Sequence, residues 1–172
     1  MYVVQILSTN RTLKLPKGAC AGTAKQTARI RRAKISDYSI CLPLFSTLYQ
    51  KDIGPNFKQV YEKFVESKDN VVLLAAHADR IGGLLVGSFH TDMDWEGTIA
   101  KVDAIIVEEA FRRKGVGRKL FHSLITFAKQ KQCKAIVSRV NLKNVGAQEF
   151  HESLGFIKAH TLEYILDLQT QQ

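Results

Sequence analysis

The clearest chemistry in the sequence lies in a turn that combines three basic residues with two glycines, Arg112-Arg113-Lys114-Gly115-Val116-Gly117. The turn follows a predicted strand and opens a predicted helix. Glycine lets a ligand come close to the backbone. The first N–H groups of a helix lack intrahelical acceptors and carry a partial positive charge. Such a turn can bind a phosphate group; the alternative is an ordinary strand-to-helix turn with solvated basic side chains.

Two familiar phosphate-binding loops are excluded for this turn. A dinucleotide-binding fingerprint requires a third glycine where the sequence has Leu120, and a P-loop requires Gly-Lys followed by Ser or Thr. Neither pattern is present. The turn therefore fits one pyrophosphate but lacks the dinucleotide pattern.

A second candidate is Asp103, an acidic residue inside an otherwise apolar strand. A buried carboxylate is costly unless it has a role or a partner, and a positioned carboxylate can act as a general base. Strand alternation predicts that Asp103 shares a face with residues 101 and 105. The alternative is a salt bridge to a neighbouring strand. No cysteine or serine lies in a recognisable nucleophile elbow or triad.

A regular succession of strands and helices must position these residues. Hydrophobic periodicity predicts the order β-α-α-β-β-β-α-β-α-β-β, with no internal repeat. The predicted strands cover residues 29–33, 71–78, 81–89, 98–107, 134–140, 155–157 and 162–168, and the predicted helices cover 36–49, 56–66, 117–132 and 144–154. The strand, helix and strand between residues 98 and 140 should form a parallel, right-handed crossover. Its helix should have one apolar face, formed by Val116, Leu120, Leu124 and Phe127. The fold class is therefore a mixed α/β fold, in which most strands are antiparallel as in α+β proteins.

Positive charge is concentrated at the N-terminus. Residues 1–36 contain eight of the 25 basic residues and none of the 16 acidic ones, so the remainder is nearly neutral. We predict a basic extension over residues 1–28 and one domain over residues 29–172. The extension resembles an organelle transit peptide in its lack of acids, and a local strand pair is the alternative. The net charge of +9 is thus poor evidence that the domain after this extension binds nucleic acid.

The remaining composition fits a globular protein in a reducing compartment. The chain of 172 residues is long enough to bury a core without disulfides. No apolar run approaches the roughly 20 residues that a membrane span requires. The three cysteines form no CxxC pattern and favour free thiols, and the histidines form no HxxxH or HxH pair, so we expect no metal site. We expect a cytoplasmic location, with organelle import as the alternative.

The phosphate-binding turn belongs to a longer pattern. It follows Val107-Glu108-Glu109-Ala110-Phe111, and a second motif runs from Asn144 to Phe156. The two motifs resemble the GNAT superfamily of acetyl-CoA-dependent N-acetyltransferases, whose members carry Arg-x-x-Gly-x-Gly and then Asn-x-x-Ala…Tyr-Glu-x-x-Gly-Phe. The resemblance covers roughly residues 29–168. It implies a central mixed sheet, mostly antiparallel, with one splayed parallel strand pair and flanking helices.

The resemblance also implies acetyl-CoA as co-substrate, with no metal. The pantetheine arm would lie beside the bulged strand before the turn, where the Val107 N–H would polarise the thioester carbonyl. The pyrophosphate would lie on the N–H groups of residues 113–118. Asn144 would contact coenzyme A or merely cap its helix, and Ala147 would leave room for the arm. The cofactor-binding residues implied are Ile105, Ile106, Val107, Arg112, Arg113, Lys114, Gly115, Val116, Gly117, Arg118, Asn144 and Ala147.

The sequence departs from the family at the catalytic acid. Many members have a tyrosine where His151 stands, and that tyrosine protonates the departing thiolate. Histidine can do the same, because its ordinary pKa of about 6.5 lies closer to neutrality than the value of about 10 for tyrosine. The alternative is a histidine that only packs beside coenzyme A. Asp103 lies on the face where some members carry a base, and would take a proton from the acceptor.

The leading interpretation is therefore an N-acetyltransferase that moves an acetyl group from acetyl-CoA to an amine by direct attack, through a tetrahedral intermediate. One alternative is a non-catalytic acyl-CoA sensor, because of the substitution at position 151. Another is a nucleic-acid-associated protein, although the basic N-terminal segment lacks interleaved aromatic residues for base stacking. We expect a small-molecule or peptide amine as the acceptor. We expect neither a nucleic acid nor a membrane as a partner, and the sequence leaves open whether the chain forms a homodimer.

Overall fold

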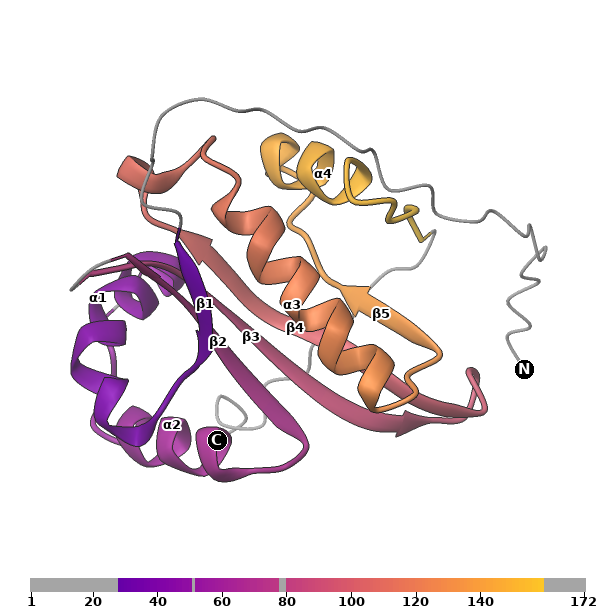
Figure 1. Ribbon diagram of the computed structural model, residues 1–172, viewed down its shortest axis with the longest axis horizontal. Helices are drawn as coiled ribbons and strands as arrows, with labels where there is room; N and C mark the ends of the chain where they lie inside the picture. The colour runs from indigo at the N-terminus through magenta and orange to yellow at the C-terminus, as the bar shows by residue number, and fades with distance from the viewer. Residues whose placement is uncertain (1–27, 51, 78–79, 160–172) are drawn as a thin grey trace, which may run out of the picture. The chain divides into compact units, whose positions relative to one another are not determined.

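The computed structural model describes residues 28–50, 52–77 and 80–159 (Figure 1). These residues fall into two compact units, one of residues 28–139 and one of residues 140–159. Most of the predicted basic extension and the predicted strand at 162–168 lie outside the described residues. Among the residues described, no helix has both the length and the apolarity to cross a membrane.

The larger unit is built on a five-stranded sheet. The strands lie side by side in the order β1 (Arg29–Arg32), β2 (Asn70–His77), β3 (Arg80–Asp92), β4 (Gly97–Val107) and β5 (Ala135–Ser138). Strands β1 to β4 pair antiparallel, whereas β4 and β5 are parallel because α3 (Val116–Gln130) crosses between them. This confirms the predicted mixed, mostly antiparallel sheet with one parallel pair and flanking helices.

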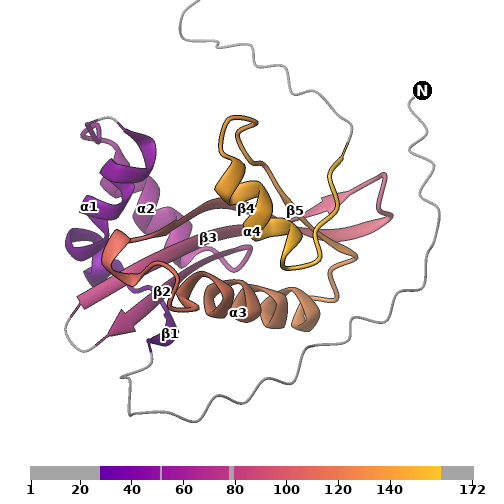
Figure 2. The same ribbon diagram turned by 90° about the horizontal axis from the view of Figure 1, so that it is seen from above.

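Two helices cover one face of this sheet. They are α1 (Tyr38–Tyr49) and α2 (Phe57–Glu66), and Figure 2 shows them on the opposite side of the sheet from α3. Successive strand residues point to opposite faces, so every second strand residue faces these helices. The core on this face contains Cys41, Leu44, Phe45, Tyr61, Val72, Leu74, Leu84, Val86 and Ala104.

A buried carboxylate fixes the start of α1. A short 3-10 turn, η1 (Ile35–Asp37), precedes the helix, and Asp37 makes no side-chain cap to α1. Its carboxylate instead accepts hydrogen bonds from both terminal nitrogens of Arg31, at 2.6 and 2.8 Å, and from the Lys34 N–H at 2.7 Å. The Arg31 guanidinium lowers the pKa of the Asp37 carboxyl. Strand β1 is thereby tied to the helical layer.

The opposite face of the sheet is covered by α3. Leu120, Phe121 and Leu124 of this helix are completely buried, which agrees with the apolar face predicted from the sequence. Gly87 of β3 allows the helix to come close, since a Cβ at that position would lie 3.0 Å from Leu124 Cδ1. The crossover helix is therefore packed directly on the strands that it connects.

Strand β4 is irregular where it leaves β5. Val86 of β3 pairs with Ala104, but the next residue, Gly87, pairs with Val102, so Asp103 is the extra residue of a β-bulge. The pairing with β5 covers residues 99–102 of β4, and the strand continues to Val107. Strand β4 thus has the bulge that the resemblance implied, and its end extends past the residues paired with β5.

The smaller unit contains α4 (Val145–Glu152). The chain turns after this helix at Gly155, which has a φ of 90°. The Gly155 N–H donates to the Glu152 carbonyl at 2.9 Å, and the Phe156 N–H donates to the His151 carbonyl at 3.1 Å. The predicted strand over residues 155–157 is wrong, because these bonds use the backbone to close the helix end.

Candidate active site

The end of β4 borders a groove of about 600 Å³. The groove is lined by two residues of α1, the last residues of β4 and the turn that follows: Leu44, Thr47, Ile106, Val107, Glu108, Glu109, Ala110 and Arg112. Three of the predicted cofactor-binding residues, Ile106, Val107 and Arg112, therefore meet here. Ile105 lies between Ala104 and Ile106, which both contact the α1–α2 core, so Ile105 faces α3.

The peptide group between Val107 and Glu108 is held at both ends. Its carbonyl oxygen accepts a hydrogen bond from Arg112 Nε at 3.0 Å. Its N–H donates to the carbonyl oxygen of Gly82 at 2.9 Å. The backbone at the end of β4 is therefore fixed in relation to β3. A backbone N–H that stabilises a developing oxyanion is most effective when the backbone is already fixed, because the donor then needs no reorganisation during the reaction.

The start of α3 carries the two predicted glycines. Gly115 is the N-cap residue and has a φ of 78°, a left-handed conformation that glycine adopts readily. The Lys119 N–H donates back to the Gly115 carbonyl at 3.1 Å, which begins the helical hydrogen bonding. The N–H groups of Val116 and Gly117 precede that bond and face out of the helix N-terminus. This geometry suits a phosphate group.

The three basic residues before α3 differ in what they contact. Arg112 holds the Val107 carbonyl, and Lys114 Nζ donates to the Ala110 carbonyl at 2.7 Å. Arg113 is exposed, has a φ of 60°, and makes no hydrogen bond or ion pair with another described residue. Two of the three predicted phosphate ligands thus also shape the backbone of the turn that bears them.

The bulge in β4 changes the surroundings predicted for Asp103. Lys101 Nζ lies 3.2 Å from Asp103 Oδ1, so these two side chains share a face, and the ion pair lies within one strand rather than between strands. The predicted shared face with Ile105 is wrong, because the extra residue of the bulge breaks the alternation. Among the described residues, no group of three or more His, Cys, Asp or Glu could hold a metal ion.

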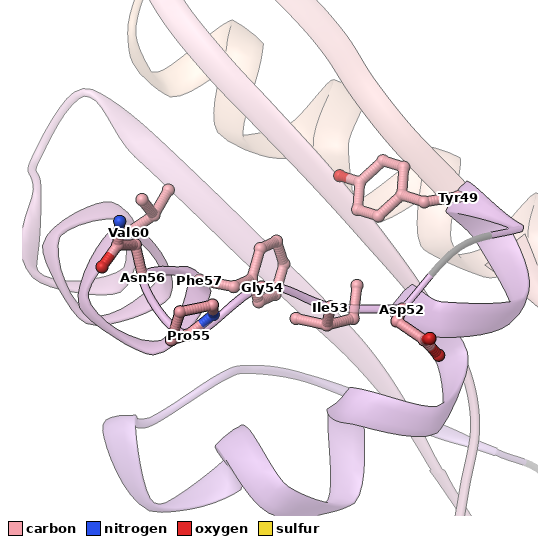
Figure 3. Close-up of a pocket in the computed structure, with 8 residues that line it drawn as sticks. All are labelled: Tyr49, Asp52, Ile53, Gly54, Pro55, Asn56, Phe57 and Val60. Atoms are coloured by element: carbon pink, nitrogen blue, oxygen red, sulfur yellow. The ribbon is translucent and has the colours of Figure 1, made fainter.

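A second hollow of about 510 Å³ lies between α1 and α2. Figure 3 shows its lining residues, Tyr49, Asp52, Ile53, Gly54, Pro55, Asn56, Phe57 and Val60. The rings of Tyr49 and Phe57 have centroids 6.2 Å apart. Burial raises the pKa of Tyr49, and the charge of Asp103 adds to this effect. The charge of Asp103 therefore lies close enough to the Tyr49 hydroxyl to disfavour its ionisation, and both residues lie on the α1–α2 face.

The predicted residues of the smaller unit form one hydrogen-bonded series. Asn144 Oδ1 accepts from the Ala147 N–H at 3.0 Å, so the N-cap predicted as its alternative role is present. The Ala147 carbonyl lies 2.7 Å from His151 Nδ1. A carbonyl oxygen only accepts, so Nδ1 carries the hydrogen of this bond. His151 is 7% exposed, and the Phe156 ring centroid lies 5.2 Å from its own.

Two residues that hold the turn beside the groove were not predicted from the sequence. Phe111 belongs to the 3-10 turn η2 (Glu109–Phe111), and its ring packs on Gly82 of β3. The sequence offered one signal, the Gly82-Gly83 pair within an apolar strand. Glycine inside a strand often marks a place where another part of the chain approaches closely.

Comparison with known proteins identifies the domain that carries these features. A sequence model of the family described as Acetyltransferase (GNAT) family matches residues 38–156. The chain belongs to this family. Both motifs, the turn before α3 and the segment from Asn144 to Phe156, lie within the matched residues.

Two curated relatives share parts of this GNAT sequence. N-alpha-acetyltransferase 30 of Schizosaccharomyces pombe is 31% identical over 114 residues, which are 64% of this chain and 74% of the relative. A protein of Methanocaldococcus jannaschii named "Uncharacterized N-acetyltransferase" is 32% identical over 81 residues, 44% of this chain and 36% of the relative. The match thus spans about a third of the archaeal protein's length.

Solved structures share the GNAT fold. An aminoglycoside acetyltransferase from an uncultured soil metagenomic sample, crystallised in complex with sisomicin, superposes with a TM-score of 0.75. The likeness covers 83% of this chain and 97% of that one at 17% sequence identity. At this identity the comparison concerns the fold. The resemblance drawn from the two motifs is therefore confirmed at the level of family and architecture.

Proposed function

We propose that this GNAT chain transfers the acetyl group of acetyl-CoA to an amine. The observation that supports the proposal most strongly is the fixed Val107–Glu108 peptide, which borders a groove and leads into the glycine-capped start of α3. Attack on a thioester requires a donor for the developing oxyanion, and a pyrophosphate suits a helix N-terminus. Both features fall within residues 105–118.

Acetyl-CoA is proposed to lie along this stretch. The backbone of residues 105–107 contacts the pantetheine arm, with the Val107 N–H directed at the thioester carbonyl. The N–H groups of residues 113–118 bind the pyrophosphate, and the exposed Arg113 adds positive charge. Asn144 and Ala147 contact coenzyme A, as the family pattern implies. The bound thioester can be attacked directly, so no covalent intermediate on the protein is needed.

Two side chains are proposed to move protons in this reaction. Asp103 takes a proton from the incoming ammonium, and the neutral nitrogen attacks the carbonyl carbon. The C–N bond forms, the nitrogen loses a second proton to water, and the C–S bond breaks. His151, protonated on both nitrogens at this step, gives its Nε2 proton to the departing thiolate. The hydrogen bond from Nδ1 to the Ala147 carbonyl supports this role, because it orients the imidazole.

The proposed acceptor is a small-molecule or peptide amine that approaches the α1–α2 face. Asp103 and Tyr49 both lie there, and the hollow beside Tyr49 has room for part of such a molecule. The names of the relatives refer to two kinds of acceptor, protein N-termini and aminoglycosides. Both kinds present a primary amine, which is the group that the chemistry requires.

A thiol-release assay with acetyl-CoA and a broad amine panel tests the proposal. The panel contains small amines, polyamines, aminoglycosides, amino acids and short peptides, and mass spectrometry of the products identifies the acetylated nitrogen. We expect thiol release that depends on at least one class of amine. Tight binding of acetyl-CoA without thiol release from any amine would support the acyl-CoA sensor instead. Absence of acetyl-CoA binding would contradict both.

A further inference from the structure

The contact between Phe111 and Gly82 ties the turn after β4 to strand β3. We propose that this contact, with Phe111 as a positioning residue, sets the spacing between the two ends of the acetyl-CoA site. One end is the Val107 N–H, and the other is the N-terminus of α3. The inference rests on the proposed function, because it requires one acetyl-CoA molecule to span both ends.

The ring of Phe111 occupies the space that a side chain at position 82 would need. An ideal Cβ on Gly82 would lie 2.6 Å from Phe111 Cγ, 2.7 Å from Cδ1 and 2.9 Å from Cδ2. Real Cβ atoms essentially never come closer than 3.0 Å to such neighbours. The contacted atoms are the ring atoms nearest the Phe111 backbone, so a Cβ at position 82 requires the whole ring, or η2 itself, to shift.

Three further side chains hold the ring in this place. The Arg80 guanidinium carbon lies 5.8 Å from the ring centroid, and Lys114 Nζ lies 5.9 Å from it. At these distances cations are attracted to an aromatic face. The His77 imidazole packs edge-on, with centroids 5.6 Å apart. The ring is thus bound by the adjoining ends of β2 and β3 and by its own turn.

The turn that Phe111 anchors joins the two ends of the site. On one side, the Gly82 carbonyl accepts the Glu108 N–H at 2.9 Å, so the glycine beneath the ring also fixes the end of β4. On the other side, Lys114 contacts the ring, bonds to the Ala110 carbonyl at 2.7 Å and immediately precedes Gly115. Displacing the ring therefore changes the spacing between the ends. A ligand held at two points gains affinity from the second point only if that spacing fits.

Comparing acetyl-CoA with its two halves tests this spacing directly. Calorimetry measures the affinity for acetyl-CoA, 3′-phosphoadenosine 5′-diphosphate and S-acetylpantetheine in Gly82→Ala, which adds a Cβ, and Phe111→Ala, which removes the ring. Gly97→Ala is the matched control, since Gly97 lies at the opposite end of β4 and the nearest atoms to its added Cβ belong to the flexible Lys134 side chain, at 3.1 Å. We expect each test variant to lose about tenfold or more in acetyl-CoA affinity but less than about twofold for either half, with the control unchanged.

A double variant tests whether the two residues act as a pair. Once the ring is absent, the three atoms nearest to a Cβ at position 82 are gone, so Gly82→Ala should cost less than about twofold in the Phe111→Ala background. The inference would be overturned if the two substitutions lowered acetyl-CoA affinity additively in the double variant. It would also be overturned if the affinities for acetyl-CoA and for its halves fell by the same factor. If Gly82→Ala does not fold, the comparison of Phe111→Ala with the wild type decides alone.

The same measurements separate this inference from the proposed function. A wild-type chain that binds neither acetyl-CoA nor its halves contradicts the proposed function, and the inference falls with it. A wild-type chain that binds acetyl-CoA, together with a Phe111→Ala variant of equal affinity, contradicts the positioning role and leaves the proposed function standing.

Discussion

At the scale of single residues, the proposed proton transfer depends on which nitrogen of His151 carries hydrogen. The Ala147 carbonyl accepts from Nδ1 at 2.7 Å, so the proton that His151 is proposed to give up is the one on Nε2. The Phe150 and Phe156 rings, with centroids 5.8 and 5.2 Å away, hold the imidazole in place. An imidazole held this way presents one nitrogen in a fixed direction, and a positioned acid requires this arrangement.

We expect His151→Ala to lower kcat by about 10²–10⁴-fold with little change in acetyl-CoA affinity. His151→Tyr should restore part of the rate, because tyrosine can donate a proton from this position. Steady-state kinetics with the best amine and calorimetry with acetyl-CoA measure the two quantities. His122→Ala is the control, since His122 is exposed on α3. Full turnover in His151→Ala would show that the imidazole only packs.

The Arg31–Asp37 pair makes stability depend on pH. Because the pKa of Asp37 is lowered in the folded chain, its contribution is present above the ordinary value of about 3.9 and is lost as pH falls through the folded value. We expect Asp37→Asn to reduce the free energy of unfolding at pH 7 by about 1–3 kcal/mol, with the difference disappearing in strong acid. Urea denaturation at several pH values measures this. Asp69→Asn, which removes an exposed pair with Lys131, should change little.

Only part of this residue-scale detail could be read from the sequence. Gly115 and Gly117 were predicted, because glycines before a helix have a recognisable spacing. The surroundings of Asp103 were not, because a β-bulge inserts one residue without a mark in the sequence and so breaks the alternation on which the prediction relied. Phe111 was missed because its partner, Gly82, acts through the absence of a side chain.

At the scale of elements, periodicity predicted the strands and helices of the larger unit well. The predicted apolar face of α3 is buried at Val116, Leu120 and Leu124, and the strand–helix–strand crossover is parallel as expected. The failure came at Gly155, where an apolar stretch suggested a strand. There the hydrogen bonds that end α4 outweighed the local pattern, and such bonds depend on a positive φ that the periodicity of apolar residues does not reveal.

The N-terminus of α3 is the element on which cofactor binding should depend most. We expect Gly117→Glu to abolish acetyl-CoA binding while the chain stays folded, because the change places bulk and negative charge among the first N–H groups of the helix. Thr126→Glu adds the same charge on the exposed side of the same helix and should bind normally. Calorimetry and circular dichroism distinguish the cases. Unchanged affinity in a folded Gly117→Glu variant would show that the pyrophosphate lies elsewhere.

At the scale of the whole molecule, charge and cofactor chemistry occupy different parts of the chain. Residues 1–36 contain eight of the 25 basic residues and no acid. The first described strand begins at Arg29, and the proposed acetyl-CoA contacts begin at Ile105. Cofactor affinity should therefore depend on the chain from residue 29 onward, whereas the net charge depends strongly on the residues before it.

We expect a chain that lacks residues 1–28 to fold and to bind acetyl-CoA with unchanged affinity at physiological salt. The deletion removes Arg11, Lys14, Lys17 and Lys25 and no acid, so the pI falls. At low salt the full chain should bind the anionic acetyl-CoA more tightly, because long-range attraction is then less screened. A full-length variant with these four residues changed to alanine should bind acetyl-CoA as weakly at low salt as the truncated chain does. If the truncated chain fails to fold while that variant folds, the removed segment contributes to the sheet or to an oligomer interface rather than through its charge.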